Sequence, residues 1–192
     1  MKITKVIYSD FDGTITKEDT VNRFFEIYAT PKWIESEKLW IEGKISSREN
    51  AIIQVGLLNN ISQKQLDDYI NSIEIDDYFL DFVDFVKSKN IKLTILSDGF
   101  DLFIKKTLER YNLDIPYYNE NCDKKAGMCK CQKVKENSFC YIGDGTSDLC
   151  IASKADLLFA TKSLHKYCKD NKIKHSHFTS FRNIINILKE GS

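Results

Sequence analysis

The sequence predicts an α/β fold, in which a parallel sheet carries helices on both faces and a small helical segment is inserted near its start. Short apolar runs alternate with helix-like segments along the 192 residues, as in βα-repeating sheets. Three of the apolar runs end in acids or a hydroxyl beside glycine, where open α/β sheets place their ligands. A stretch after the first run shows only helical periodicity.

The first strand is expected over Val6–Tyr8, and Gly13 and Thr14 form the turn that ends this segment. Asp10 and Asp12 lie between strand and turn, at the carboxyl end of the strand. One carboxylate can serve as a nucleophile or metal ligand, and its neighbour two residues on can transfer protons.

Four helices are expected in the segment that follows. Their predicted starts are, in chain order, Asp19 or Thr20, Thr30-Pro31, Ser46-Ser47 and Ser62-Gln63. The sequence therefore predicts a helical domain over residues 17–75, with short hinges near Thr16-Lys17 and Ile75-Asp76. Residues 1–16 and 76–192 are expected to form the α/β core.

The rest of the core is expected to alternate between helices and strands. Its predicted elements are a helix through Phe79–Val86, a strand at Ile91–Leu96, a helix through Phe103–Leu108, strand-like runs at 116–118, 138–142 and 157–160, and a final helix through Phe181–Leu188.

Two of these strands end in groups suited to charged ligands. Asp144 stands between two glycines after the run 138–142, and Asp148 follows on a helix expected to begin near Thr146. Ser97 offers a hydroxyl, and the turn after it offers backbone N–H groups at a helix start. Three carboxylates with waters suit Mg²⁺. A cation site, an anion site and a nucleophilic carboxylate together indicate phosphoryl transfer.

These motifs resemble those of the haloacid dehalogenase superfamily of aspartyl-phosphate hydrolases. The matching residues are, in order, Asp10-Phe11-Asp12-Gly13-Thr14, Ser97, a lysine, and Gly143-Asp144 with Asp148. The resemblance spans residues 6 to about 150. It implies a Rossmann-like core with a small helical cap of the C1 type, which would close over the site, exclude water and choose the substrate.

The resemblance also implies a role for each matched residue. Asp10 would attack phosphorus, and Asp12 would protonate the leaving alcohol and later activate water. Mg²⁺ would bind the carboxylates of Asp10 and Asp144 and the backbone carbonyl of Asp12. Asp148 would orient the water shell of the metal. The predicted metal-site residues are therefore Asp10, Asp12, Asp144 and Asp148.

Phosphate binding is expected from Ser97, the turn that begins with Asp98, and one lysine. Lys130 follows Cys129, as in relatives with a Cys-Lys pair at this point, and is the expected lysine. Lys133 is the alternative.

Substrate choice is expected to depend on the cap. The cap and the run Ser97–Asp101 resemble the phosphoserine phosphatase branch, but Ile52 stands where those enzymes carry the arginine that binds the substrate carboxylate. Asp19 stands where they use glutamate. Asp19 and Arg48 are the candidate substrate-selecting residues, with Arg23 as another possible carboxylate partner.

A second resemblance is to the methionine-salvage phosphatases of the same superfamily. It rests on the start Asp10–Thr16, the Cys-rich stretch before Lys130, and Leu157–Ala160 followed by Leu164 and Cys168. Those enzymes dephosphorylate 2-hydroxy-3-keto-5-methylthiopentenyl-1-phosphate. The cap aromatics Phe24, Phe25, Trp33 and Trp40 are candidates for lining its thioether pocket or for forming the cap's own core.

The sequence thus predicts a Mg²⁺-dependent phosphatase of a small phosphomonoester, with that salvage intermediate as the leading candidate and phosphoserine as the alternative. Two other classes stay open at this point. A phosphotransferase would share every motif, and a non-catalytic binding module could share the fold. Intact Asp10, Asp12, Asp144 and Asp148 argue against the binding module.

Composition supports a cytoplasmic enzyme that acts on a small phosphorylated metabolite. The 28 basic and 28 acidic residues give a formal net charge of zero, and no basic stripe suggests nucleic acid. No apolar run approaches the length of a membrane span or a signal peptide. A monomer or a homodimer is expected.

The six cysteines are expected to be thiols. Cys122, Cys129 and Cys131 could alternatively bind zinc with a fourth ligand. The candidates for that ligand are His175, His177 and Cys168.

Overall fold

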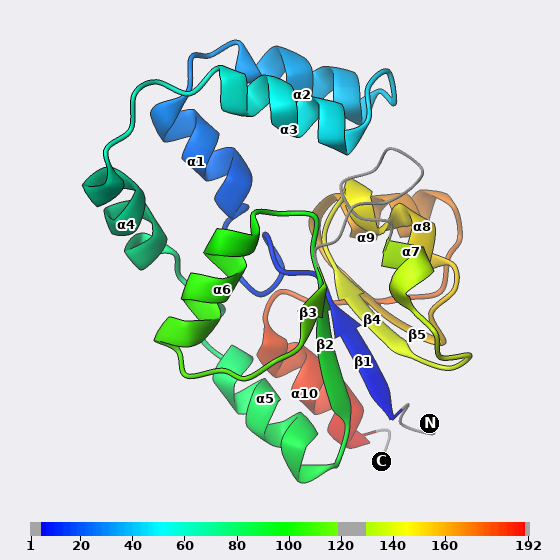
Figure 1. Cartoon of the computed structure of the whole chain (residues 1–192). Coiled ribbons are helices and arrows are strands. Elements are labelled where there is room, and N and C mark those ends of the chain that lie inside the picture. The colour runs from blue at the N-terminus through cyan, green and yellow to red at the C-terminus, as the bar shows by residue number, and fades with distance from the viewer. Residues whose placement is uncertain (1–4, 119–129, 191–192) are drawn as a thin grey trace.

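The computed structural model describes residues 5–118 and 130–190 (Figure 1). Its centre is a six-stranded sheet in the order β3-β2-β1-β4-β5-β6, and every neighbouring pair is parallel. The strands are β1 (Val6–Ser9), β2 (Lys92–Leu96), β3 (Tyr117–Tyr118), β4 (Cys140–Gly143), β5 (Leu157–Ala160) and β6 (Ser176–His177). All six carboxyl ends therefore meet at one edge of the sheet.

Helices cover both faces of this sheet. On one face lie α5 (Phe79–Ser88), α6 (Asp101–Arg110) and α10 (Phe181–Glu190). On the other lie α7 (Lys130–Lys133), α8 (Leu149–Ala152) and α9 (Lys162–Asp170), with the 3-10 turn η1 (Thr146–Asp148) before α8. The predicted α/β architecture is confirmed.

Alternating side chains in each strand explain why both faces need cover. Ile7 packs into the core cluster under α5 and α10, while Tyr8 packs into the cluster under α8 and α9. Likewise, Ile142 packs into the first of these clusters and Tyr141 into the second. Side chains of a strand point to opposite faces with a period of two, so a strand that is apolar at every position must be covered twice.

The helical insertion leaves and rejoins the core at one place. Thr16 and Ile75 form an isolated antiparallel bridge, and the N–H of Asp76 donates to the carbonyl of Ile15 at 2.8 Å. Both predicted hinges therefore lie side by side. The division of the chain into two domains at residues 17 and 75 stays a prediction.

The insertion contains α1 (Thr20–Tyr28), α2 (Trp33–Ile41), α3 (Ser47–Gly56) and α4 (Gln63–Ser72). Asp19 caps α1, and Ser46 and Ser62 form capping boxes at the starts of α3 and α4. Helix α2 begins later than the predicted start at Thr30, because i to i−3 bonds first form a turn, with the N–H of Trp33 donating to Thr30.

The four inserted helices pack in two different ways. Helices α1 and α4 share an apolar cluster with α6 of the core, which includes Phe24, Phe25, Tyr69 and Phe103. Phe24 and Phe25 thus belong to the insertion's own core. Helices α2 and α3 pack on one another and overhang the carboxyl edge of the sheet (Figure 1). This hairpin and the start of α1 are parts of the insertion that face the strand ends.

The sequence did not predict α9 or β6. Only Leu164 and Cys168 of α9 are buried, and β6 is a two-residue edge strand, so both have weak apolar patterns. Among the described residues, no helix is long and apolar enough to cross a membrane.

Candidate active site

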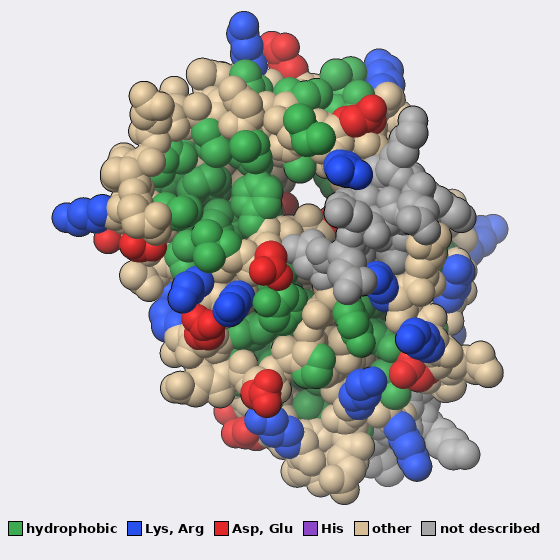
Figure 2. Space-filling view, in the orientation of Figure 1, with side chains coloured by type: hydrophobic (Ala, Val, Ile, Leu, Met, Phe, Trp, Pro, Cys, Tyr) green, Lys and Arg blue, Asp and Glu red, His purple; other side chains and the backbone are tan. Residues whose placement is uncertain are grey.

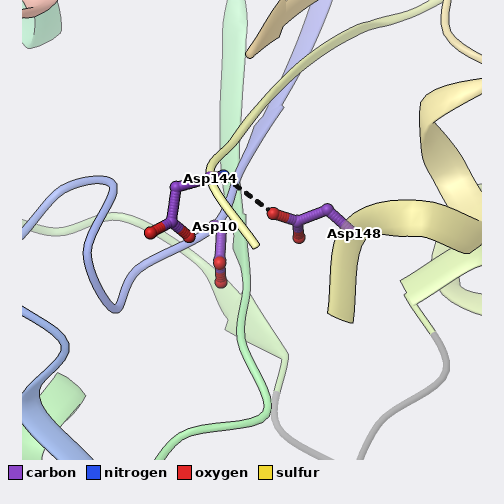
Figure 3. A group of neighbouring side chains, drawn as sticks. All are labelled: Asp10, Asp144 and Asp148. Atoms are coloured by element: carbon purple, nitrogen blue, oxygen red, sulfur yellow. Dashed lines mark hydrogen bonds between the residues drawn. The ribbon is translucent and has the colours of Figure 1, made fainter. Parts of the chain in front are cut away.

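Three carboxylates from two neighbouring strands meet at the carboxyl edge of the sheet (Figure 3). The N–H of Asp10, just after β1, donates to the carbonyl of Ile142 in β4 at 2.9 Å. Asp144 and Asp148 follow β4. One oxygen from each of Asp10, Asp144 and Asp148 lies within 4.8 Å of the other two. Parallel pairing of β1 with β4 therefore brings together acids that are far apart in the sequence.

Asp148 is fully buried and is held by four hydrogen bonds. Its Oδ2 accepts from the backbone N–H groups of Asp144 at 2.9 Å and Gly145 at 3.0 Å. Its Oδ1 accepts from the hydroxyl of Tyr141 at 2.5 Å and the Nζ of Lys130 at 2.6 Å. With both oxygens engaged, Asp148 positions the Asp144 loop and offsets the charge of Lys130.

Lys130 is also fully buried and links Asp148 to Asp10, with its Nζ 2.7 Å from Asp10 Oδ1. Burial disfavours its charge, but the carboxylates of Asp10 and Asp148 outweigh that effect and raise the pKa of Lys130. Burial and the charge of Asp148 raise the pKa of Asp10, while the ammonium of Lys130 opposes the rise. Lys130 is thus the cation that supports an ionised Asp10.

Asp12, unlike Asp10, accepts its hydrogen bonds from uncharged groups. Its Oδ1 accepts from the N–H of Thr20 at 3.3 Å and from the Thr20 hydroxyl. Its Oδ2 accepts from the Ser97 hydroxyl at 3.2 Å, and that hydroxyl oxygen accepts from the N–H of Gly99. Burial raises the pKa of Asp12 to about 6, although the Thr20 hydrogen bond opposes the rise. A carboxyl with this pKa can both give and take a proton near neutral pH.

Two glycines are required by the close packing around Asp144 and Asp148. Gly13 has a φ of +69°, and a Cβ there would lie 2.5 Å from Asp144 Oδ2. A Cβ on Gly143 would lie 2.3 Å from Asp148 Oδ2. Both positions therefore exclude any side chain while the carboxylates keep their places.

Lys162 is a second cation at the site that sequence reasoning missed. Its Nζ donates to Asp144 Oδ2 at 3.0 Å and to the carbonyl of Gly13 at 2.6 Å. Burial raises the pKa of Asp144, and the ammonium of Lys162 opposes the rise. Its position in the chain is the signal that could have found it, because Lys162 follows β5 as the acids follow β1 and β4.

A cavity of about 220 Å³ opens above the carboxylates, beneath α2 of the α2–α3 hairpin. Figure 2 shows the molecular face hollowed below this hairpin. The lining of the cavity includes five of the site residues predicted from the sequence, namely Asp10, Asp12, Asp19, Asp98 and Asp144. It also includes Glu37 and Trp40 of α2.

Some predicted residues are not brought to this cavity. Arg48 is exposed on α3 and does not line it. Of the two candidate lysines, Lys130 contacts Asp10, whereas Lys133 Nζ lies 6.0 Å from the centre of the Tyr118 ring. Cys122 and Cys129 of the suggested zinc site lie outside the described residues. Cys168, a residue of α9, is buried in the core between that helix and the sheet.

The donor set at the strand ends fits Mg²⁺. Asp10, Asp144 and Asp148 offer only hard carboxylate oxygens, the ligands this ion prefers. Within residues 5–118 and 130–190 they are the only group of three acidic, histidine or cysteine side chains with atoms close enough to hold a metal. Since Asp148 already accepts four hydrogen bonds, Asp10 and Asp144 are the better placed direct ligands.

Comparison with known sequences identifies the relatives of the chain. The haloacid dehalogenase-like hydrolase family matches residues 7–153, more than half of the chain. A 2-hydroxy-3-keto-5-methylthiopentenyl-1-phosphate phosphatase of Bacillus velezensis is 29% identical over 96% of this chain and 89% of its own length. A phosphatase of the same name from Brevibacillus brevis is 28% identical over 96% of this chain and 95% of its own length.

Comparison with solved structures shows the fold. A substrate-bound phosphoserine phosphatase has a TM-score of 0.69 at 20% identity and covers 97% of this chain and 99% of its own. A phosphoserine phosphatase from T. onnurineus has a TM-score of 0.71 at 15% identity, with coverage of 97% and 95%. The topology described above is therefore the one these phosphatases share.

Proposed function

The chain belongs to the haloacid dehalogenase-like hydrolases, and we propose that it is a Mg²⁺-dependent phosphatase that cleaves a small phosphomonoester through an aspartyl-phosphate on Asp10. The observation that carries the proposal is the buried ion pair between Asp10 and Lys130 beneath an acidic cavity that Asp10 lines. A carboxylate that must be ionised to attack gains from a fixed cation 2.7 Å away.

The first half of the reaction transfers the phosphoryl group to the protein. An oxygen of Asp10 attacks phosphorus, and the bond between phosphorus and the leaving oxygen breaks. Asp12 gives its proton to that leaving oxygen, so that a neutral alcohol departs. Ser97, the turn at Asp98 and Lys130 would hold the phosphoryl oxygens during the transfer.

The second half regenerates Asp10. Asp12, now ionised, takes a proton from a water molecule, and the water oxygen attacks phosphorus. The bond from Asp10 to phosphorus breaks, and inorganic phosphate leaves. A pKa of Asp12 near 6 supports both roles. Mg²⁺ bound by Asp10, Asp144 and the carbonyl of Asp12 would offset negative charge on the phosphoryl oxygens.

The relatives make 2-hydroxy-3-keto-5-methylthiopentenyl-1-phosphate the first substrate to test. Phosphoserine is the second candidate, because the neighbouring folds are phosphoserine phosphatases. The absence of a lysine or arginine from the described cavity lining favours the first over a substrate with a free carboxylate. A phosphotransferase would use the same Asp10 chemistry but release phosphate only with a second alcohol as acceptor.

The deciding experiment is phosphate release from a panel of phosphomonoesters with Mg²⁺, beside an EDTA control and Asp10→Asn. The panel contains the salvage intermediate, phosphoserine, sugar phosphates, nucleotides and phosphocholine. We expect Asp10→Asn to lower release by roughly 10⁴-fold or more, as losses of nucleophiles do, while the fold stays intact by circular dichroism. Turnover of Asp10→Asn at the wild-type rate would refute the covalent mechanism.

A further inference from the structure

The catalytic cavity continues into a second hollow of about 90 Å³ beneath α2 and α3. The two hollows share Asp12, Asp19, Glu37, Trp40 and Asp98 in their linings. We call the second hollow the cap pocket. A substrate whose phosphate lies at Asp10 would extend its leaving-group end into this pocket.

Glu37 is held in the cap pocket by two amides of α3. Its Oε2 accepts from Asn50 Nδ2 at 2.8 Å and from Gln54 Nε2 at 2.9 Å. A carboxylate only accepts hydrogen bonds, so these contacts determine which end of the Asn50 amide points at Glu37. They place the Asn50 carbonyl oxygen on the other side.

That oxygen has no donor. Asn50 is only 5% exposed and lines the cap pocket, and its Oδ1 has no hydrogen-bond partner among the described residues. Buried acceptors are nearly always paired, because an unpaired one costs about 1–3 kcal/mol. An orphan acceptor on a residue that lines a pocket marks a place where a bound molecule can supply the donor.

The charge of the pocket points to the same kind of ligand. Asp12, Asp19, Glu37 and Asp98 line it, and no lysine, arginine or histidine does so within the described chain. Trp40 adds an aromatic wall that also favours a cation. A carboxylate would meet four like charges and no basic side chain of the described residues there.

We propose that the cap pocket binds hydrogen-bond donors on the leaving-group end of the substrate, and that a protonated amine suits it best. This rests on the phosphatase function proposed above. An ammonium group supplies N–H donors for Asn50 Oδ1 and Glu37 and also offsets the acidic lining. A hydroxyl supplies a donor without the charge and ranks second, while an alkyl group supplies neither.

A matched series of short phosphomonoesters tests the proposal: 2-aminoethyl, 2-hydroxyethyl, propyl and carboxymethyl phosphate. We expect kcat/KM to fall in that order, with 2-aminoethyl exceeding propyl phosphate by roughly tenfold or more. Glu37→Gln should shrink the aminoethyl-to-propyl ratio, and Asn50→Leu should shrink it too. Glu35→Gln, on the exposed side of α2, should leave the ratio unchanged. Equal rates for the two compounds, or a ratio unchanged in Glu37→Gln, would overturn the proposal.

A binding measurement separates this inference from the phosphatase function. Calorimetric titration of Asp10→Asn protein with 2-aminoethyl and propyl phosphate needs no turnover. Tighter binding of the aminoethyl compound supports the pocket assignment even if no phosphate were released in the kinetic series. Equal affinity, or no binding of either compound, overturns the assignment. Phosphate release that lacks the expected order would leave the phosphatase standing and reject the pocket proposal alone.

Discussion

The two ends of the catalytic cavity differ in how completely their polar groups are paired. At the sheet edge, Asp148 accepts four hydrogen bonds and Lys130 bridges two carboxylates. In the cap pocket, Asn50 Oδ1 has no donor in the described structure, and the carboxylates lining the pocket, Glu37 among them, meet no basic side chain there. At the sheet edge Asp148 and Lys130 are fully paired within the protein, whereas in the cap pocket Asn50 Oδ1 is not.

This difference follows the division of labour in the proposed reaction. The phosphoryl group is common to every candidate substrate, so the groups that handle it gain from being fixed before the substrate arrives. The leaving-group end varies, and unpaired acceptors at the cap make binding depend on what that end carries. The groups that are paired within the protein would therefore handle the phosphoryl group, and the unpaired acceptors of the cap pocket would select the leaving group.

The largest expected effect comes from breaking the pairing at the sheet edge. Lys130→Met leaves Asp10 and Asp148 buried without their shared cation. We expect a loss of about 3–5 kcal/mol in the free energy of unfolding, typical of a broken buried pair. Phosphate release should fall by roughly 10²-fold or more, as when one fixed donor at a reacting oxyanion is removed. Urea unfolding and initial rates measure the two effects.

Lys133→Met is the matched control, three residues along the same short helix. It should change both quantities much less, because Lys133 lies beside the ring of Tyr118. Equal effects of the two substitutions would mean that the ion pairs of Lys130 do not organise the site.

Glycine substitution tests the geometry of the same edge. A Cβ at Gly143 would lie 2.3 Å from Asp148 Oδ2 and force that carboxylate from its four donors. We expect Gly143→Ala to cost about 1–3 kcal/mol of stability, the range for an overpacked core, and to weaken Mg²⁺ binding. Gly145→Ala is the control, since its Cβ would meet no atom within 4 Å. Thermal unfolding with and without Mg²⁺ compares them, and equal behaviour would contradict the crowding argument.

A smaller effect is expected at the cap. Gln54→Met removes one of the two donors to Glu37 but keeps the length of the side chain. We expect a loss of about 1 kcal/mol in the free energy of unfolding, since Asn50 still holds Glu37. Urea unfolding measures it. A loss as large as that of Lys130→Met would show that the cap is as firmly paired as the sheet edge.

The smallest expected effect lies in a polar cluster that lines neither end of the cavity. His165 Nδ1 lies 2.8 Å from His175 Nε2, and the centre of the His165 ring is 4.2 Å from that of His177. Burial, followed by the two neighbouring histidines, lowers the pKa of His165. The unfolded chain then binds the proton more readily, so stability should fall as pH drops below about 6.5.

His165→Asn should flatten that part of the stability profile. The measurement is the unfolding temperature of wild type and variant between about pH 5 and pH 8, the range in which a histidine titrates. Parallel profiles would show that protonation of His165 is not linked to folding.

Local patterns in the sequence were sufficient for the fold and for the position of the acids. Buried strands such as Cys140–Gly143 are apolar at nearly every position, and the acids follow them directly. Parallel strands share one carboxyl edge, so the sequence placed Asp10 and Asp144 near each other before any contact was known. Helix starts such as Ser46 and Ser62 also follow from a four-residue pattern.

Only the tertiary structure decided which side chains pair. Spacing along the chain left Lys130 and Lys133 open, and the packing of α7 brings Lys130 to Asp10. Lys162 reaches Asp144 only because β5 lies beside β4. The contact of Glu37 with Asn50 depends on how α2 packs on α3. Such contacts join residues by distance in space, and hydrophobic periodicity carries no information about them.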